Sequence, residues 1–245
     1  MDKKMVSMLL EFEFGSFPGA WRPARDLSEL VFGASGSWDL DFGIWDLARI
    51  PMALVLTAVF VGANFVAAIF LTWMPSYLNR AFGMSLTRAG LNATLWLQAA
   101  SVAGVLCGGW LADRWARRRG GRPLVQSVGL LVGAPVVFLT GWARDVEVLV
   151  AAMAGFGFFK GLYDANIWAS LYDVVPARRR ATAQGLMNAV GWLGAGVAPV
   201  AVGAASARYG MAACLSATSA VYLLCGCLLV AGTAVFFPRP PVLTR

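Results

Sequence analysis

Long apolar runs separated by short polar loops dominate the chain from about residue 50 onward. A helix needs about 20 mostly apolar residues to cross the roughly 30 Å hydrocarbon core of a bilayer. Six segments meet this length: Met52–Met74, Leu91–Ala112, Leu124–Trp142, Val148–Leu171, Ala181–Ala205 and Met211–Phe236. The runs do not alternate as barrel strands do, and helices satisfy their own backbone groups in lipid. The pattern therefore predicts an all-α membrane protein with six transmembrane helices.

The first 50 residues differ from the rest of the chain. They hold eight of the thirteen acidic residues and show neither a helical nor a strand period. We expect residues 1–50 to form a poorly ordered cytoplasmic segment and residues 51–245 to form a six-helix transmembrane domain.

Composition agrees with a membrane protein and excludes several other classes. The chain is 59% hydrophobic and 13% charged, which is too apolar for an ordinary soluble domain. It contains no histidine, so His-based catalytic triads, a rhomboid-like Ser–His protease and His metal sites are excluded. The four cysteines lie inside apolar runs without ligand-like spacing. We expect no enzyme activity, no cofactor and no metal site.

The distribution of Lys and Arg predicts the orientation. The net charge of +7 could suggest nucleic-acid binding, but the arginines cluster in short loops between apolar runs, as in membrane proteins. Fifteen basic residues fall on the side that holds both termini, and Arg80, Arg88, Arg144 and Arg208 fall on the other. By the positive-inside rule, both termini are cytoplasmic, and we expect the bacterial inner membrane as the location.

The second span ends in a motif, Gly108–Gly109–Trp110–Leu111–Ala112–Asp113–Arg114–Trp115–Ala116–Arg117–Arg118–Arg119. It resembles the signature loop of the major facilitator superfamily, Gly-x-Leu-Ala-Asp-Arg-x-Gly-Arg-(Arg/Lys), with Ala116 in place of a glycine. The segments Trp73–Leu78 and Tyr172–Gly185 also resemble that superfamily, and fit its second half better than its first. Among its branches, the anion:cation symporters look most similar.

This resemblance implies one six-helix half of a twelve-span fold. Full members have two halves related by an axis along the membrane normal. Residues 1–50 would then stand where the central cytoplasmic loop lies, and a truncated or frame-shifted gene is one plausible origin of that segment. The resemblance also implies secondary active transport of a small polar solute, with a coupling ion, by alternating access.

Two ionisable residues lie within a predicted span and are therefore candidates for function. Lys160 and Asp164 are spaced i, i+4, so they share a helix face and can pair. Tyr163 extends that face, and Asn64 falls near the middle of the first span. We expect Lys160, Asp164, Tyr163 and Asn64 to hold an anionic solute or a coupling ion. The alternative is an ion pair that only fixes helix packing.

Asp113 is the candidate for a conformational latch, with Arg114, Arg117 and Arg118 beside it. A carboxylate at this helix end can accept hydrogen bonds from a facing helix N-terminus and pair with arginine. In the resembled family such a latch favours the outward-open state. The alternative is a charge cluster that only sets topology.

Small and polar residues on two spans indicate a partner. The fifth span carries Gly185, Gly191, Gly194, Gly196 and Gly203, and Pro199 invites a bend. Gln98 and Asn188 are amides within spans, which we interpret as packing or half-to-half contacts. The expected partners are a small solute, the lipid bilayer and either a second six-helix half or a second copy of the chain. A truncated, non-transporting remnant or a membrane interaction subunit shares every one of these motifs and remains the alternative function.

Overall fold

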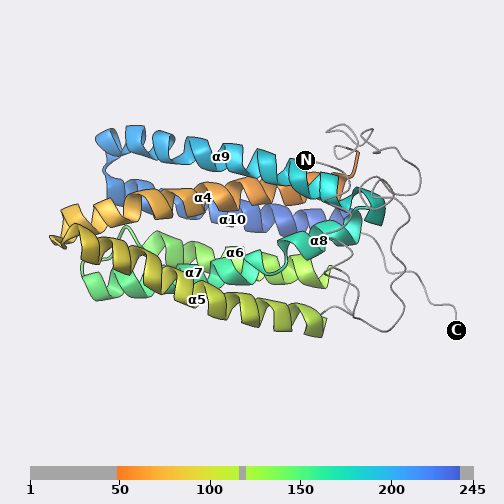
Figure 1. Ribbon diagram of the computed structural model, residues 1–245, viewed down its shortest axis with the longest axis horizontal. Coiled ribbons are helices and arrows are strands. Elements are labelled where there is room, and N and C mark those ends of the chain that lie inside the picture. The colour runs from red at the N-terminus through yellow and green to blue at the C-terminus, as the bar shows by residue number, and fades with distance from the viewer. Residues whose placement is uncertain (1–48, 116–119, 238–245) are drawn as a thin grey trace, which may run out of the picture. The chain divides into compact units, whose positions relative to one another are not determined.

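The computed structural model describes residues 49–115 and 120–237. The predicted segment 1–50, apart from its last two residues, and the latch candidates Arg117 and Arg118 lie outside the described residues. The helices are α4 (Pro51–Phe82), α5 (Leu86–Trp115), α6 (Gly121–Leu139), α7 (Val146–Asp164), α8 (Ile167–Val174), η1 (Ala177–Arg179), α9 (Arg180–Tyr209) and α10 (Met211–Phe236), as Figure 1 shows.

The prediction of six spans is confirmed for the described part of the chain. Six stretches there are long and apolar enough to cross a membrane, and each overlaps one predicted run. Two details differ. The third span ends at Leu139, three residues earlier than predicted, and the fourth span is not one helix but two, because α7 stops at Asp164 and α8 starts at Ile167. The fifth span continues as one helix across Pro199.

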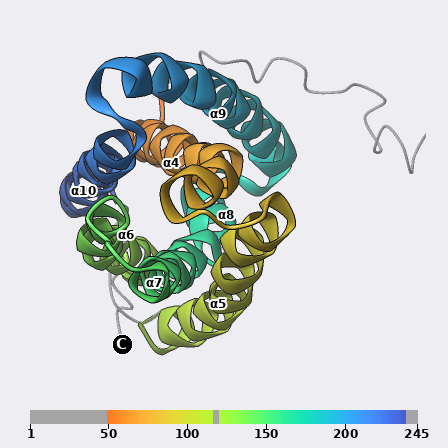
Figure 2. The same cartoon turned by 90° about the vertical axis from the view of Figure 1, so that its left-hand side faces the viewer.

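The helices pack side by side around a common core (Figures 1 and 2). Contacts run from α4 to α10, then to α6, α7 and α5, and from α5 back to α4, while α9 packs against α4 and α10. The largest side chains in the core come from different helices, so they tie the bundle together. Phe70 of α4 packs against Phe156 of α7 with 4.5 Å between ring centroids and the rings tilted by 40°, and Phe156 meets the Tyr222 ring of α10 at 5.6 Å.

The seam between α5 and α7 is held by glycines. A Cβ atom added to Gly104 of α5 would lie 2.0 Å from the backbone oxygen of Phe158, and one added to Gly161 of α7 would lie 2.2 Å from that of Ser101. Both atoms are main-chain atoms, so the two helix backbones are in direct contact. The motif glycines differ: Gly108 faces Leu162 of α7, but a Cβ on Gly109 would meet nothing within 4 Å.

The flanking helices α5 and α9 are the most exposed. In the most apolar window of each, 22% of the residues are buried, against 50% for α4 and for α6. Large apolar side chains cover their outer surfaces, among them Leu106, Trp110, Trp192, Leu193 and Val200. The glycines of the fifth span, which the sequence analysis took to indicate a partner, are in part covered by the bundle itself. Gly191, Gly194 and Gly203 lie against Phe60, Val61 and Trp73 of α4, whereas Gly185 and Gly196 face open space.

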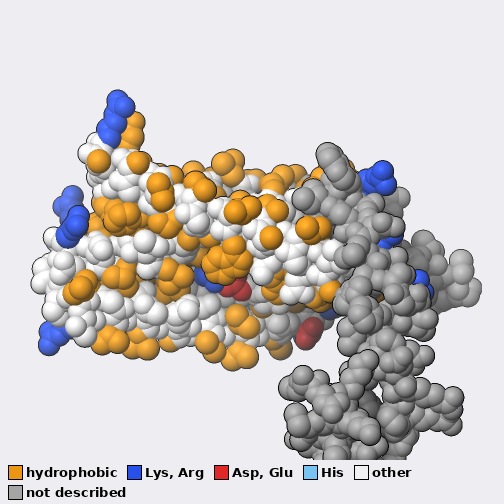
Figure 3. All heavy atoms as spheres, turned by 45° about the horizontal axis from the view of Figure 1, so that its top comes forward, with side chains coloured by type: hydrophobic (Ala, Val, Ile, Leu, Met, Phe, Trp, Pro, Cys, Tyr) orange, Lys and Arg blue, Asp and Glu red, His pale blue; other side chains and the backbone are white. Residues whose placement is uncertain are grey.

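Charged side chains gather mainly at the two ends of the bundle. Figure 3 shows one face, on which Lys and Arg side chains lie toward both ends and an adjoining basic and acidic patch lies midway. The described charges at the end where α6 and α9 begin are mostly arginines, including Arg114, Arg122 and Arg178–Arg180. This is the end that the sequence predicts to be cytoplasmic.

Candidate functional site

Lys160 and Asp164 form an ion pair within the fourth span. The ammonium group of Lys160 donates to Oδ2 of Asp164, one helical turn further on. The two side chains retain 22% and 36% of their exposure, so neither is sealed in the core. The pair is therefore partly accessible and lies halfway along an apolar span.

The place of the pair follows from its neighbours on α7. Gly157 and Gly161 face α5, whereas Phe156 packs into the core against α4 and α10. Because each helical residue turns by about 100°, Lys160 and Asp164 lie on the strip of α7 between these two packed faces. Asp164 is also the last residue of α7. The helix dipole disfavours a carboxylate at a C-terminal end, so the ionised Asp164 depends on Lys160.

The structure does not bring the other two predicted site residues into this ion pair. Tyr163 is 1% exposed, and its hydroxyl is buried without a hydrogen-bond partner among the described residues. Asn64 donates from Nδ2 to the carbonyl oxygen of Phe60, one turn back on α4, at 2.9 Å. A Cβ on Gly191 of α9 would lie 3.4 Å from the same nitrogen. Asn64 therefore lies where α4 meets α9.

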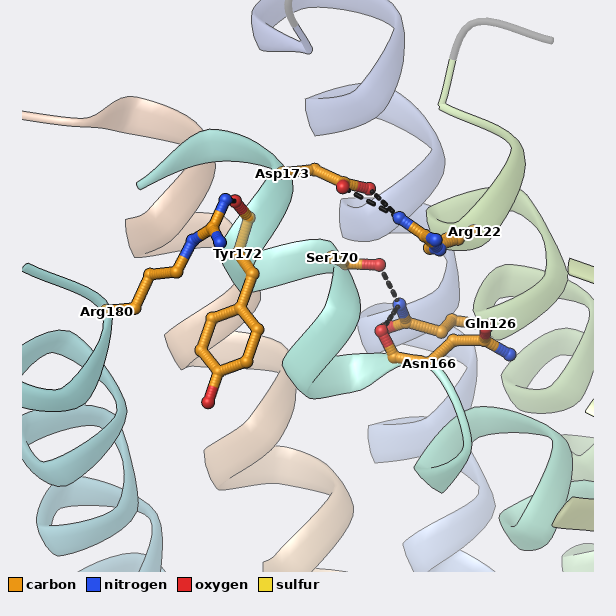
Figure 4. Close-up of polar contacts among 7 residues, drawn as sticks. All are labelled: Arg122, Gln126, Asn166, Ser170, Tyr172, Asp173 and Arg180. Atoms are coloured by element: carbon orange, nitrogen blue, oxygen red, sulfur yellow. Dashed lines mark hydrogen bonds and ion pairs between the residues drawn. The ribbon is translucent and has the colours of Figure 1, made fainter. Parts of the chain in front are cut away.

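A buried polar cluster holds the break between α7 and α8 (Figure 4). Gln126 of α6 donates from Nε2 to the carbonyl oxygen of Asn166, at 3.0 Å, and to the hydroxyl of Ser170. Asn166 in turn donates from Nδ2 to the carbonyl oxygens of Gly108 (3.1 Å) and Leu162 (3.3 Å). The break is thus tied to α5 and α6 by side chains.

An ion pair joins α6 and α8 near the end of the same span (Figure 4). Nη1 of Arg122, one turn before Gln126 on α6, lies 2.7 and 2.9 Å from the two carboxylate oxygens of Asp173 on α8. Next to it, Arg180 of α9 donates to the carbonyl oxygen of Tyr172 at 2.9 Å and lies over its ring. The Tyr172 hydroxyl bonds with the side-chain oxygen of Gln184. These contacts connect α6, α8 and α9 at one end of the bundle.

The latch candidates that the structure describes are exposed. Asp113 and Arg114 lie in the last turn of α5, and both side chains are accessible to solvent. Their position at a helix end agrees with a role outside this bundle.

Sequence reasoning missed Gln126, Asn166, Arg122 and Asp173 as parts of a site. Gln126 is the only amide side chain in the predicted span Leu124–Trp142. A single amide in an apolar span was the one sequence feature that could have pointed to this cluster. The partners of Gln126 lie 40 and 44 residues away in the chain. Their proximity is set by helix packing, which a single sequence does not reveal.

The six membrane-spanning helices and their packing define an integral membrane protein with the architecture of a transporter half. The sequence matches the Major Facilitator Superfamily over residues 37–245, and the chain belongs to this family. The suspected family resemblance is therefore confirmed.

The curated relatives are transporters. A D-galactonate transporter of Escherichia coli is 30% identical over 175 residues, and the match covers 69% of this chain and 40% of that transporter. A probable sulfoacetate transporter of Cupriavidus necator is 31% identical over 184 residues, and the match covers 72% of this chain and 40% of that transporter. A probable galactarate/D-glucarate transporter of E. coli is 28% identical over 154 residues, and the match covers 61% of this chain and 34% of that transporter. The chain spans 40% or less of the length of these relatives.

A solved structure shows the same fold. The crystal structure of a bacterial homologue of the human lysosomal transporter Spinster, in an inward-facing and unoccupied conformation, superposes with a TM-score of 0.67. The match covers 96% of this chain and 58% of the other at 14% identity. At that identity the likeness concerns the fold alone.

Proposed function

We propose that the chain supplies one half of a secondary transporter for a small organic anion, with Lys160 as the group that receives the anion. The observation that carries this proposal is the partly exposed Lys160–Asp164 pair midway along an apolar span. An ionisable residue in a span is costly and marks a solute or ion pathway by default. Solute sites in such transporters lie near the midplane of the bilayer.

The relatives support the charge of the solute. Galactonate, galactarate, glucarate and sulfoacetate, the solutes in the names of those proteins, are all anions. An anion that binds the Lys160 ammonium must displace Asp164 from it. The freed carboxylate would then be the natural group to take up a proton, since a single buried charge is disfavoured. Proton coupling through Asp164 is therefore part of the proposal.

The assembly requires a second six-helix unit. The outer faces of α5 and α9 expose large apolar side chains. The amides of Gln98 on α5 and Asn188 on α9 are exposed on the same two helices. An amide facing hydrocarbon seeks a hydrogen-bond partner, so these faces suit protein better than lipid. We propose that a separate six-helix half or a second copy of this chain covers them.

The orientation and the latch belong to the same proposal. Both termini lie in the cytoplasm of a bacterial cell, at the inner membrane, and Asp113 contacts a helix N-terminus of the partner half. The uneven distribution of basic residues supports the orientation. The exposure of Asp113 and Arg114 at the end of α5 supports a contact outside this bundle.

Single and double substitutions of the ion pair test this function. Removing one partner strands a charge in a low-dielectric site and should harm more than removing both. We expect Lys160→Ala and Asp164→Ala each to abolish anion uptake by the complete assembly. The Lys160→Ala/Asp164→Ala double variant should regain normal membrane levels yet stay inactive. A well-expressed Lys160→Ala protein with full uptake would contradict the proposal. No uptake by any well-expressed wild-type assembly would favour the interaction subunit instead.

A further inference from the structure

We propose that the hydroxyl groups of Tyr163 on α7 and Tyr222 on α10 share a buried water molecule beside Asp164. In the complete transporter this water serves the Asp164 carboxyl when a solute anion takes Lys160 from it, a consequence that rests on the proposed function. The water itself is a property of the helix bundle and is tested without transport.

Both tyrosines are buried, and their hydroxyl groups are unpaired. Tyr163 is 1% exposed and Tyr222 is 0% exposed, and neither hydroxyl oxygen has a hydrogen-bond partner among the described residues. A buried tyrosine hydroxyl usually finds a partner, because leaving it unpaired is unfavourable. Buried water molecules commonly supply such partners to otherwise unsatisfied polar groups. The two hydroxyls therefore require an explanation, and a water is the ordinary one.

Tyr222 reaches from α10 to the face of α7 that carries Tyr163. The ring centroid of Tyr222 is 5.6 Å from that of Phe156, and a Cβ added to Gly133 of α6 would lie 3.5 Å from two Tyr222 ring carbons. The same added Cβ would lie 3.1 Å from the Cβ of Phe159. Residues 156, 159 and 163 are spaced i, i+3, i+7, so they share one face of α7. The helices α6, α7 and α10 thus meet around the two tyrosines (Figure 2).

Two further polar groups belong to the same neighbourhood. Tyr163 and Tyr222 interact electrostatically with each other, and both interact with the Asp164 carboxyl and the Cys225 thiol. Cys225 is three residues after Tyr222 on α10 and is buried. Lys160 bonds to Oδ2 of Asp164, so Oδ1 remains to accept another bond. Two hydroxyls, a carboxyl and a thiol give a buried water the polar neighbours that it needs.

A water beside Asp164 suits both protonation states of the carboxyl. Water and phenol hydroxyls each donate and accept hydrogen bonds. The water donates to Asp164 when the carboxylate is ionised, and it accepts the bond from the carboxyl O–H after Asp164 has taken up a proton. Neither tyrosine gives up its own proton. The freed carboxyl therefore keeps a partner at the step in which the solute anion holds Lys160.

Removing the two hydroxyl groups, singly and together, tests the shared water. We expect Tyr163→Phe and Tyr222→Phe each to raise the unfolding equilibrium constant of the purified full chain in mixed micelles about fivefold, the effect of one net hydrogen bond. The double variant should fall clearly short of the product of the two effects, about 25-fold, because both hydroxyls depend on one water. The matched control is Tyr209→Phe, since Tyr209 is 64% exposed and its hydroxyl loses nothing but solvent. Single variants as stable as wild type, or a double variant that shows the full product, would overturn the shared water.

The hydroxyl protons distinguish a water from a direct bond between the two tyrosines. In the chain labelled with ¹³C on its tyrosine rings, both hydroxyl protons should show rotating-frame cross-relaxation with water, of the sign opposite to chemical exchange. Tyr163→Phe should weaken the water signal of Tyr222. Cross-relaxation between the two hydroxyls alone would overturn the water, as would hydroxyl protons that exchange with bulk water too fast to be seen.

Transport by the complete assembly tests the consequence for Asp164. We expect Tyr222→Phe to slow net anion uptake about fivefold, again the effect of one hydrogen bond. Exchange of labelled for unlabelled anion needs no net proton uptake and should keep its wild-type rate. Equal loss of both rates, as a merely structural defect would give, or unchanged net uptake, would overturn the role beside Asp164. The proposed function is judged by uptake in wild type and Lys160→Ala, so its failure leaves the unfolding and hydroxyl-proton results standing.

Discussion

Adding a single methyl group at two glycines of α5 tests the packing on which the bundle rests. In Gly104→Ala, the new Cβ would lie 2.0 Å from the Phe158 oxygen and 2.8 Å from the Phe158 carbon, and such contacts are essentially never below 3.0 Å. Both are backbone atoms, so no rotamer change relieves the clash and α5 must move away from α7. Overpacking of this kind costs about 1–3 kcal/mol.

Gly109→Ala makes the same chemical change five residues further along the same helix. Nothing lies within 4 Å of its added Cβ. Alanine in a helix is more stable than glycine by roughly 0.5–1 kcal/mol, so this variant should unfold no more easily than wild type. The helix preference for alanine is common to both variants and cancels, so they should differ in unfolding free energy by the overpacking cost alone, about 1–3 kcal/mol.

The assay is reversible unfolding of the purified chain in mixed micelles, followed by helix content. Gly155→Ala gives a graded third case, because its Cβ would meet a side-chain atom of Val136 at 2.9 Å. Its cost should fall when Val136→Ala is added, whereas Phe158→Ala should not rescue Gly104→Ala. Equal stability of Gly104→Ala and Gly109→Ala would refute the packing of α5 on α7.

Three further predictions concern charges. Reporter fusions at Arg245 should be active only on the cytoplasmic side, and labels at Arg80 and Arg144 only on the outer side; the reverse would refute the orientation drawn from the fifteen-to-four asymmetry. Asp113→Asn in a complete assembly should leave insertion intact but shift the inward/outward population about tenfold, since a charge-assisted bond contributes about 1.5–3 kcal/mol; unchanged accessibility labelling would favour the topological alternative. Arg122→Ala should lower the unfolding free energy by less than about 1 kcal/mol, because the two side chains of the pair keep 35% and 34% of their exposure. A loss several times larger in thermal unfolding would show that Asp173 is far better shielded than the structure indicates.

The sequence predicts the spans well because the bilayer imposes one simple rule. A run of about twenty apolar residues must satisfy its own backbone hydrogen bonds in lipid and therefore forms a helix, and all six segments follow that rule. The spacing of Lys160 and Asp164 likewise predicts their pairing, because i, i+4 contacts are local.

The remaining features depend on contacts between distant segments. The helix break at Ala165–Asn166 carries no glycine or proline, and there the Asn166 carbonyl oxygen accepts a hydrogen bond from Gln126, 40 residues away. Tyr163 directly precedes Asp164 in the sequence, yet it is buried, and α6 approaches this part of α7 at Gly129. The same holds for the α9 glycines, three of which α4 covers. Periodicity predicts on which face of a helix a residue lies, but it does not predict which helix packs against that face.

Uptake into liposomes tests the central claim most directly, namely that this chain is one half of an organic-anion transporter. The purified chain would be reconstituted as a monomer, as a cross-linked dimer and with a co-expressed six-helix partner, and supplied with labelled D-galactonate or, as a neutral control, D-galactose. The account predicts anion uptake only in the paired forms, and loss of that uptake in Lys160→Ala. Uptake by the monomer, or equal uptake of the neutral sugar, would contradict it.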